Sequence, residues 1–292
     1  MAKHVIIDSI ARSGTTLVSA ILRSQEKTMV FCPGFNEVLS CKNIGQWPHG
    51  VCRQDFLQNV EIDLDKFKNE SFSQIVDFSQ YYGLSKDEWR SIIFDASSPE
   101  NIRENIEQAF PEIELFCYRW NQGLCYFNNW VDKGQDYLWL SMIRNPLDRS
   151  ISSFEKHGWT YEDSLKNTVA FLQKAEMIKQ HNQFGLFYYE DLIEKQKTIV
   201  SEMYDFFGVT IKDIDLTNIK GSNGKAFVPQ SSTNKNTIKK DGYHVGEKFT
   251  GLYKKGINRH MQSSMDDAIK DIFANTLINS PLVGKYFDGV TK

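Results

Sequence analysis

A glycine-containing segment near the beginning of the chain, DSIARSGTTLVSAIL (residues 8–22), has the composition of a loop that binds an anion. Gly14 lets the backbone approach a ligand closely, because glycine has no side chain. The amide groups of Thr15 and Thr16 fall in the first turn of a predicted helix. Free N–H groups and the positive end of the helix dipole face outward there. This arrangement predicts a site for a phosphate or a related oxyanion.

The segment differs from the loop of nucleotide triphosphatases, which reads G-x-x-x-x-G-K-[ST]. Gly14 and Thr16 match that pattern, but Thr15 occupies the place of the lysine and Ser9 that of the first glycine. The positive charge comes instead from Arg12, whose planar guanidinium can bind an oxyanion with two hydrogen bonds. This shift argues against ordinary ATP chemistry. The alternative is a plain strand–turn–helix with Arg12 in solvent.

A second segment, YLWLSMIRNPLDRSISSF (residues 137–154), predicts another anion site. Arg144 lies where a strand ends, and Asn145 can cap a helix that begins with Pro146. Ser152 follows about two helical turns later, near the core-facing edge. An arginine and a serine hydroxyl can jointly hold a phosphate; the alternative is a surface arginine beside an ordinary capped helix. The apolar residues expected to face the core are Leu147, Ile151 and Phe154.

Short apolar segments predict the strands that must position these residues. They read HVIIDSI, TMVF, YLWLSMI and GLFYYE, and their length and β-branched or aromatic content are typical of buried strands. Helical patterns follow the first, third and fourth of them. The sequence therefore predicts an α/β fold in which a parallel sheet with βα connections is flanked by helices.

The middle of the chain, about residues 51–133, is expected to form a helical insertion within a single domain that spans residues 1–292. SKDE at Ser85 has the form of a capping box, and Ser98 before Pro99 indicates another helix start. The aromatic segment IELFCYRWNQGLCYFNNW is interpreted as a buried helix that packs on the sheet. The polar residues 221–248 are expected to form a long loop over the site.

The composition excludes several classes of protein. The net charge of −3 gives no indication of nucleic-acid binding. The five cysteines include no CxxC pair, and Cys32, Cys41 and Cys52 are too far apart for the usual zinc spacings. No apolar run is long enough for a signal peptide or a membrane span. A cytoplasmic protein without a metal or a membrane partner is therefore expected.

Together the motifs resemble those of sulfotransferases that use 3′-phosphoadenosine 5′-phosphosulfate (PAPS). ARSGTTL resembles the family's 5′-phosphosulfate loop, and IRNPLDRSISSF resembles its 3′-phosphate motif. FYYEDLIEKQKTIVSEMYDFFGV is similar to the family's Tyr-Glu-Asp strand-to-helix segment. YKKGINRHM is similar to its late Arg-Lys-Gly loop, with Lys254 where arginine is usual. The four segments occur in the family's order.

The resemblance implies a P-loop, nucleotide-kinase-like, three-layer fold and a set of residues that bind the cofactor. By resemblance, the 5′-phosphosulfate is held by Arg12, Ser13, Gly14, Thr15 and Thr16. The residues implied for the 3′-phosphate are Arg144, Ser152, Lys255 and Gly256. Tyr189 takes the place of the tyrosine that contacts adenine. The middle segment commonly shapes the acceptor pocket in this family.

The activity that the resemblance implies is sulfuryl transfer from PAPS to a hydroxyl, or less readily an amine, of a small molecule, glycan or peptide. Adenosine 3′,5′-bisphosphate is released, no metal is needed, and Arg12 stabilises charge on the leaving phosphate. Some members use a glutamate after the first helix as general base, which places Glu37 there. Others use a histidine, for which His49 is the second candidate. A solvated loop carboxylate is the alternative for Glu37.

Two other functions are compatible with the motifs. A kinase-like phosphotransferase with an altered loop would require ATP and magnesium. A non-catalytic relative would bind the desulfated nucleotide without turnover, and Glu37 is the sequence feature that speaks against it. Arg12 in the loop, joined to Arg144 and Ser152, favours the sulfotransferase over the kinase.

Overall fold

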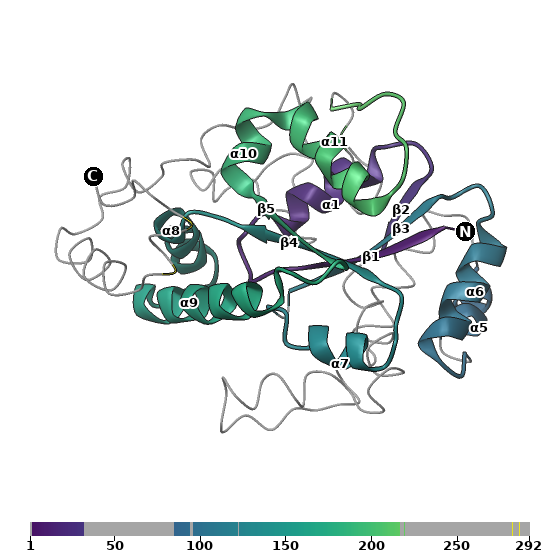
Figure 1. Cartoon of the computed structure of the whole chain (residues 1–292), viewed down its shortest axis with the longest axis horizontal. Helices are drawn as coiled ribbons and strands as arrows, with labels where there is room; N and C mark the ends of the chain where they lie inside the picture. The colour runs from purple at the N-terminus through teal and green to yellow at the C-terminus, as the bar shows by residue number, and fades with distance from the viewer. Residues whose placement is uncertain are drawn as a thin grey trace.

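The protein is described here by a computed structural model that covers residues 2–31, 85–93, 96–121, 123–216, 219, 282 and 286. These residues form a five-stranded parallel sheet with the order β2-β3-β1-β4-β5 (Figure 1). The strands are β1 (Lys3–Asp8), β2 (Thr28–Phe31), β3 (Leu115–Trp120), β4 (Leu138–Ile143) and β5 (Phe184–Tyr188). The predicted parallel α/β sheet is confirmed.

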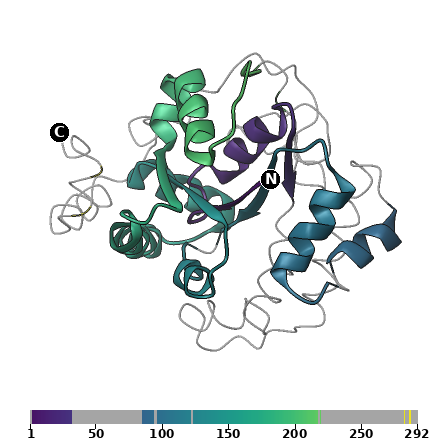
Figure 2. The same ribbon diagram turned by 45° about the vertical axis from the view of Figure 1, so that its right-hand side comes forward.

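Helices cover both faces of the sheet. The helices are α1 (Thr15–Arg23), α5 (Lys86–Ile93), α6 (Pro99–Ala109), α7 (Phe127–Asp132), α8 (Pro146–His157), α9 (Tyr161–Ile178), α10 (Tyr189–Glu194) and α11 (Gln196–Phe207). Figure 1 shows α1, α10 and α11 on one face and α7, α8 and α9 on the other. Figure 2 shows α6 beside α5, away from α10 and α11. No helix in the described ranges is both long and apolar enough to cross a membrane.

The alternation of side chains along β1 explains why the sheet is covered twice. Successive residues of a strand point to opposite faces. Val5 and Ile7 accordingly pack in the cluster that contains the apolar sides of α1 and α11. Ile6 packs in the cluster that contains residues of α6, α7 and α9. All three side chains are fully buried, so the continuous apolar run HVII is that of a central parallel strand.

The strand order places a ligand site between β1 and β4. The chain leaves β1 through α1 to reach β2 on one side, whereas β4 lies on the other side of β1. In open α/β sheets, ligands bind outside the carboxyl ends of the strands where the connections diverge in this way. β1 ends at Asp8 and β4 ends at Ile143. The two predicted anion motifs follow directly after these residues.

The predicted helix starts are confirmed by their capping hydrogen bonds. The Asn145 side chain accepts from the backbone N–H groups at the start of α8, which begins at Pro146. Ser98 caps α6 in the same way, and Ser85 and Glu88 form the reciprocal bonds of a capping box. The expected core position of Phe154 is wrong. Its ring is 49% exposed and stacks on Tyr161 of α9.

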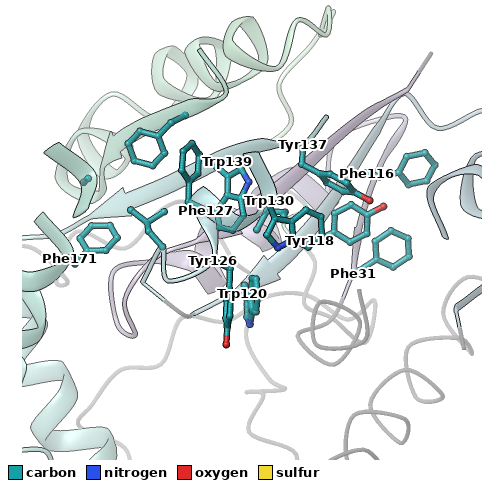
Figure 3. Close-up of a cluster of buried hydrophobic side chains, with 14 of the residues drawn as sticks. Phe31, Phe116, Tyr118, Trp120, Tyr126, Phe127, Trp130, Tyr137, Trp139 and Phe171 are labelled. Atoms are coloured by element: carbon teal, nitrogen blue, oxygen red, sulfur yellow. The ribbon is translucent and has the colours of Figure 1, made fainter. Parts of the chain in front are cut away.

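The aromatic segment in the middle of the chain is not one buried helix. Its first part forms β3, which pairs with both β1 and β2, and α7 follows after a turn. A short apolar run that is buried on both sides has no periodicity that separates strand from helix, which is why the prediction failed. Figure 3 shows the resulting aromatic cluster, which lies on the face of the sheet that packs against α6, α7 and α9. It includes a stacked pair, Trp120 and Tyr126, with ring centroids 5.0 Å apart.

A polar group is buried near the amino end of β1. His4 is 3% exposed and lies between the Tyr118 hydroxyl, 2.7 Å from Nδ1, and a Glu107 carboxylate oxygen, 2.9 Å from Nε2. Burial, which is the larger cause, and the positive charge of Arg103 together lower the pKa of His4 to about 3. The ring is therefore neutral in the folded protein near neutral pH, and both of its nitrogens are hydrogen-bonded.

This buried histidine predicts a loss of stability in mild acid. Below about pH 6.5 the unfolded chain binds a proton at His4 that the folded protein does not bind until about pH 3. The free energy of unfolding should therefore decrease as the pH is lowered from about 6.5 to about 3, by up to about 1.4 kcal/mol per pH unit for this proton. Urea denaturation of the wild type and His4→Gln at several pH values measures the difference in slope. Identical slopes would contradict a neutral buried His4.

Candidate active site

The loop between β1 and α1 has a backbone suited to an anion. Arg12 has a φ of 73° and Gly14 a φ of 102°, while Ser13 between them is not left-handed. Alternation of this kind turns successive N–H groups toward one point, and the free amides of α1 add to them. The Ser13 hydroxyl is buried and makes no hydrogen bond to any residue that the structure describes. Such a hydroxyl fits a bound oxyanion.

The two predicted anion motifs meet in one site. The Nε–H of Arg12 donates to the Ser152 hydroxyl oxygen of α8 at 2.9 Å. An Nη1–H of Arg144 donates to the backbone carbonyl of Arg12 at 3.3 Å. Arg12 is thus not free in solvent, and Arg144 is not an isolated surface residue. The resemblance assigned Arg12 and Ser152 to different phosphates, whereas the structure brings their side chains into direct contact.

Tyr189, the first residue of α10, closes the same site from a third element. The guanidinium carbon of Arg144 lies 4.6 Å from the centre of the Tyr189 ring, which is a cation–π geometry. Gly14 lies against the Cδ2–Cε2 edge of the same ring. A Cβ at residue 14 would be only 2.5 Å from Tyr189 Cδ2. Of the predicted residues, the structure therefore gathers Arg12, Gly14, Arg144, Ser152 and Tyr189. Thr15 and Thr16 lie in the first turn of α1 beside them.

Glu190 was missed by the sequence reasoning, although it lies in the quoted Tyr-Glu-Asp segment. One of its carboxylate oxygens accepts from the Asn145 backbone N–H at 2.9 Å. Burial raises the pKa of Glu190, against the opposing effects of the backbone hydrogen bonds and of the Arg144 charge. This carboxyl group links the start of α10 to the start of α8. It thereby fixes Tyr189 and Arg144 relative to each other.

The end of β3 also reaches the loop, which the sequence did not indicate. The Thr15 hydroxyl donates to Asn121 Oδ1 at 2.9 Å. Asp8, at the end of β1, is fully buried, and its two carboxylate oxygens accept from the backbone N–H groups of Gly123 and Leu124 at 3.1 and 2.9 Å. Asp8 therefore holds the turn after β3 against β1. Asn121 is exposed and lies beside the first turn of α1 as a result.

Arg149 is the second residue that the sequence reasoning missed. It lies on α8 and is 1% exposed. Its Nε–H donates to the Ala11 carbonyl at 3.0 Å, and its Nη1 donates to the Ser164 carbonyl and the Thr168 hydroxyl at 2.6 and 3.0 Å. Burial, followed by the charges of Arg144 and Arg12, lowers the pKa of Arg149 to about 9. An arginine inside IRNPLDRSISSF was the available signal, because such a residue is rarely buried without a specific role.

Some predicted site residues lie outside the described part of the chain. These are Glu37, His49, Lys255 and Gly256, together with the polar residues 221–248. In the ranges that the structure describes, no three His, Cys, Asp or Glu side chains are grouped so that they could hold a metal ion. The described site therefore consists of a left-handed loop, three arginines, the buried carboxyl groups of Asp8 and Glu190, and neutral hydrogen-bonding groups.

Comparison with solved structures identifies the fold of the chain. A sulfotransferase domain from the curacin biosynthetic pathway superposes with a TM-score of 0.56 at 13% sequence identity, over 94% of this chain and 98% of that domain. The chain has the fold of a sulfotransferase domain. A sulfotransferase from Alicyclobacillus acidocaldarius gives a TM-score of 0.48 at 8% identity, over the full length of both chains.

Sequence similarity is more limited. No protein-family model matches the chain. Sulfotransferase 2A6 of Mus musculus is 26% identical over 164 residues, which are 48% of this chain. The match spans 56% of the mouse protein, so the chain matches little more than half of the length of this curated relative. The similarity supports a relation to sulfotransferases.

The contact between Gly14 and Tyr189 predicts a difference between two glycine substitutions. Gly14→Ala adds a Cβ at a left-handed position and against the Tyr189 ring, whereas Gly134→Ala adds one at a left-handed position with no atom within 4 Å. Both should lose about 1–2 kcal/mol from backbone strain. Gly14→Ala should lose about 1–3 kcal/mol more from the steric clash. Urea denaturation of the two variants measures this, and equal losses would contradict the close packing.

Proposed function

We propose that the protein is a sulfotransferase that moves a sulfuryl group from PAPS to a hydroxyl acceptor. The observation that carries the proposal is that Arg12, in a left-handed conformation just before α1, is hydrogen-bonded to both Ser152 and Arg144. Cationic side chains, a serine hydroxyl and backbone amides at one point are the groups that bind phosphate oxygens. The sulfotransferase fold and the similarity to the mouse enzyme support the same assignment.

In the proposed reaction, the acceptor oxygen forms a bond to sulfur while the bond from sulfur to the 5′-phosphate oxygen breaks. The 5′-phosphate takes the electron pair and gains negative charge. We assign the stabilisation of this charge to Arg12, the Ser13 hydroxyl and the amides near Gly14, with Thr15, which donates to Asn121 in the structure, as a further candidate. A sulfuryl group carries less negative charge than a phosphoryl group, so the proposed transfer requires no metal ion.

The 3′-phosphate is assigned to Arg144 and Ser152, with Lys255 and Gly256 as further contacts from outside the described residues. Arg144 is held over the Tyr189 ring and by the Arg12 carbonyl, so its guanidinium is already oriented before a nucleotide binds. Tyr189 is proposed to contact adenine with the part of its ring that does not cover Gly14. Preorganised charge of this kind lowers the free-energy cost of binding.

The proton of the acceptor requires a base. Glu37 is our first candidate and His49 our second, and both lie outside the described residues. The acceptor is proposed to be a small molecule, a glycan or a peptide with a hydroxyl group. Thr15 and Asn121, which are in contact at the start of α1, are not general bases at neutral pH. A base from another segment is therefore part of the proposal.

The proposal predicts that adenosine 3′,5′-bisphosphate stabilises the protein in the absence of metal. At a concentration one hundred times its Kd, it should add about 2.7 kcal/mol to the free energy of unfolding. Adenosine 5′-monophosphate, which lacks the 3′-phosphate, should stabilise the protein much less because it leaves Arg144 without its ligand. Thermal denaturation in the presence of EDTA measures both effects.

ATP with magnesium serves as the comparison for the kinase alternative. Stabilisation by ATP with magnesium, together with no effect of adenosine 3′,5′-bisphosphate, would contradict the sulfotransferase proposal. Equal stabilisation by adenosine 3′,5′-bisphosphate and adenosine 5′-monophosphate would contradict only the assignment of the 3′-phosphate to Arg144.

The assignment of the base predicts the effect of Glu37→Gln. This variant keeps the size of the side chain and removes the proton acceptor, so turnover should fall by about 10²–10⁴. The affinity for adenosine 3′,5′-bisphosphate should stay near that of the wild type. Turnover is measured with PAPS and an acceptor found by screening phenols, sugars and small alcohols. His49→Gln is the matched control, and a greater loss in His49→Gln than in Glu37→Gln would reverse the assignment.

A further inference from the structure

Arg149 is a buried cation whose hydrogen-bond partners are all neutral. It donates to the carbonyls of Ala11 and Ser164 and to the Thr168 hydroxyl. No carboxylate of a described residue forms an ion pair with it. Burial of a charge without a counter-charge is unfavourable. The positive charges of Arg144 and Arg12, which both lower the pKa of Arg149, add to this unfavourable electrostatic energy.

The hydrogen bond from Arg149 acts on the most strained part of the loop. Arg149 binds the Ala11 carbonyl, and Arg144 binds the carbonyl of the next residue, Arg12. Arg12 has a φ of 73°, which is unfavourable for any residue other than glycine. In a trans peptide the N–H points away from the preceding C=O. Holding the Ala11 carbonyl toward α8 therefore directs the Arg12 N–H away from α8.

The other end of the guanidinium is anchored on α9. Nη1 donates to the Ser164 carbonyl and to the Thr168 hydroxyl, which itself donates to the Ser164 carbonyl at 3.0 Å. Thr168 and Ser164 are both buried. Arg149 therefore joins the loop to two helices, and α9 supplies the rigid support. A side chain that only filled space would need neither the charge nor this set of bonds.

We propose that Arg149 is a positioning residue that holds the Ala11 carbonyl so that Arg12 keeps its anion-binding conformation, and that its charge is balanced by the polyanionic nucleotide. This proposal rests on the proposed nucleotide site and adds a third arginine to it, one that acts through the backbone. Arg149 is too enclosed by α8 and α9 to be a direct ligand, since it is 1% exposed. The strain at Arg12 and the buried charge are both features that a bound anion would offset.

The test compares four variants by calorimetric binding of adenosine 3′,5′-bisphosphate at several salt concentrations. Arg149→Met removes the charge and all three bonds, and should weaken binding roughly tenfold or more. It should also make the Kd less dependent on salt, since one charge near the phosphates is gone. Arg149→Lys keeps the charge but lacks the several N–H donors of the planar guanidinium. It should therefore bind with intermediate affinity and with the salt dependence of the wild type.

Two further variants separate positioning from general stability. Thr168→Val removes one anchor on α9 and leaves the charge, so it should weaken binding without changing the salt dependence. Ile106→Val lies in the core on α6 and should lower stability while it leaves the Kd unchanged. Thr168→Val and Arg149→Lys keep the test decisive if Arg149→Met does not fold.

The outcomes distinguish this proposal from the proposed function. A wild type that binds adenosine 3′,5′-bisphosphate, with variants at Arg149 and Thr168 that bind it equally well, overturns the positioning role and leaves the nucleotide site intact. A wild type that does not bind adenosine 3′,5′-bisphosphate overturns the nucleotide site, and the role of Arg149 falls with it. A loss of affinity in Ile106→Val equal to that in Arg149→Met would show that stability alone is responsible.

Discussion

Two neighbouring backbone carbonyls, those of Ala11 and Arg12, each accept a hydrogen bond from an arginine. One of these arginines lies on α8, and the other directly follows β4. Arg149 holds the first carbonyl and Arg144 the second. Without these bonds nothing in the local sequence would favour the left-handed conformation of Arg12. The loop keeps its shape because a different part of the chain fixes it. The amides at the start of α1 and the Ser13 hydroxyl directly follow the backbone that these two bonds hold.

The same constraint explains the electrostatics of the site. Three arginines surround the loop, and their mutual repulsion and burial are visible in the lowered pKa of Arg149. The carboxyl group of Glu190 lies beside these arginines, and burial raises its pKa against the opposing effect of the Arg144 charge. Cationic groups enclosed by low-dielectric walls attract polyanions more strongly than surface arginines do.

The sheet supplies the positions from which these groups act. Because β1 lies between β3 and β4, the ends of three strands meet around one loop. β4 delivers Arg144, and β3 delivers Asn121, which Asp8 holds in place through the following turn. The aromatic cluster packs against this end of the sheet, with Trp120 at the end of β3 stacked on Tyr126, the residue before α7 (Figure 3).

The sequence by itself determined the local elements. The strand before the loop, the helix at Thr15 and the Asn145 cap depend on residues a few positions apart, whose backbone preferences and hydrogen bonds are nearly independent of the rest of the chain. The resemblance to known motifs then gave most of the described site. β3 could not be recognised, because a run that is buried on both faces has no period that distinguishes strand from helix.

Only the tertiary structure decided which of these local elements act together. The Arg12–Ser152 bond joins residues 140 positions apart, and the Arg149–Ala11 bond joins residues 138 positions apart. The bond between Thr15 and Asn121 exists because β3 lies next to β1, which no local pattern specifies. Whether an arginine is a solvated charge or a buried clamp depends on which carbonyls the packed helices bring within its reach. The partners of Arg149 come from the loop after β1 and from α9, so they surround it only once the sheet and its helices have packed together.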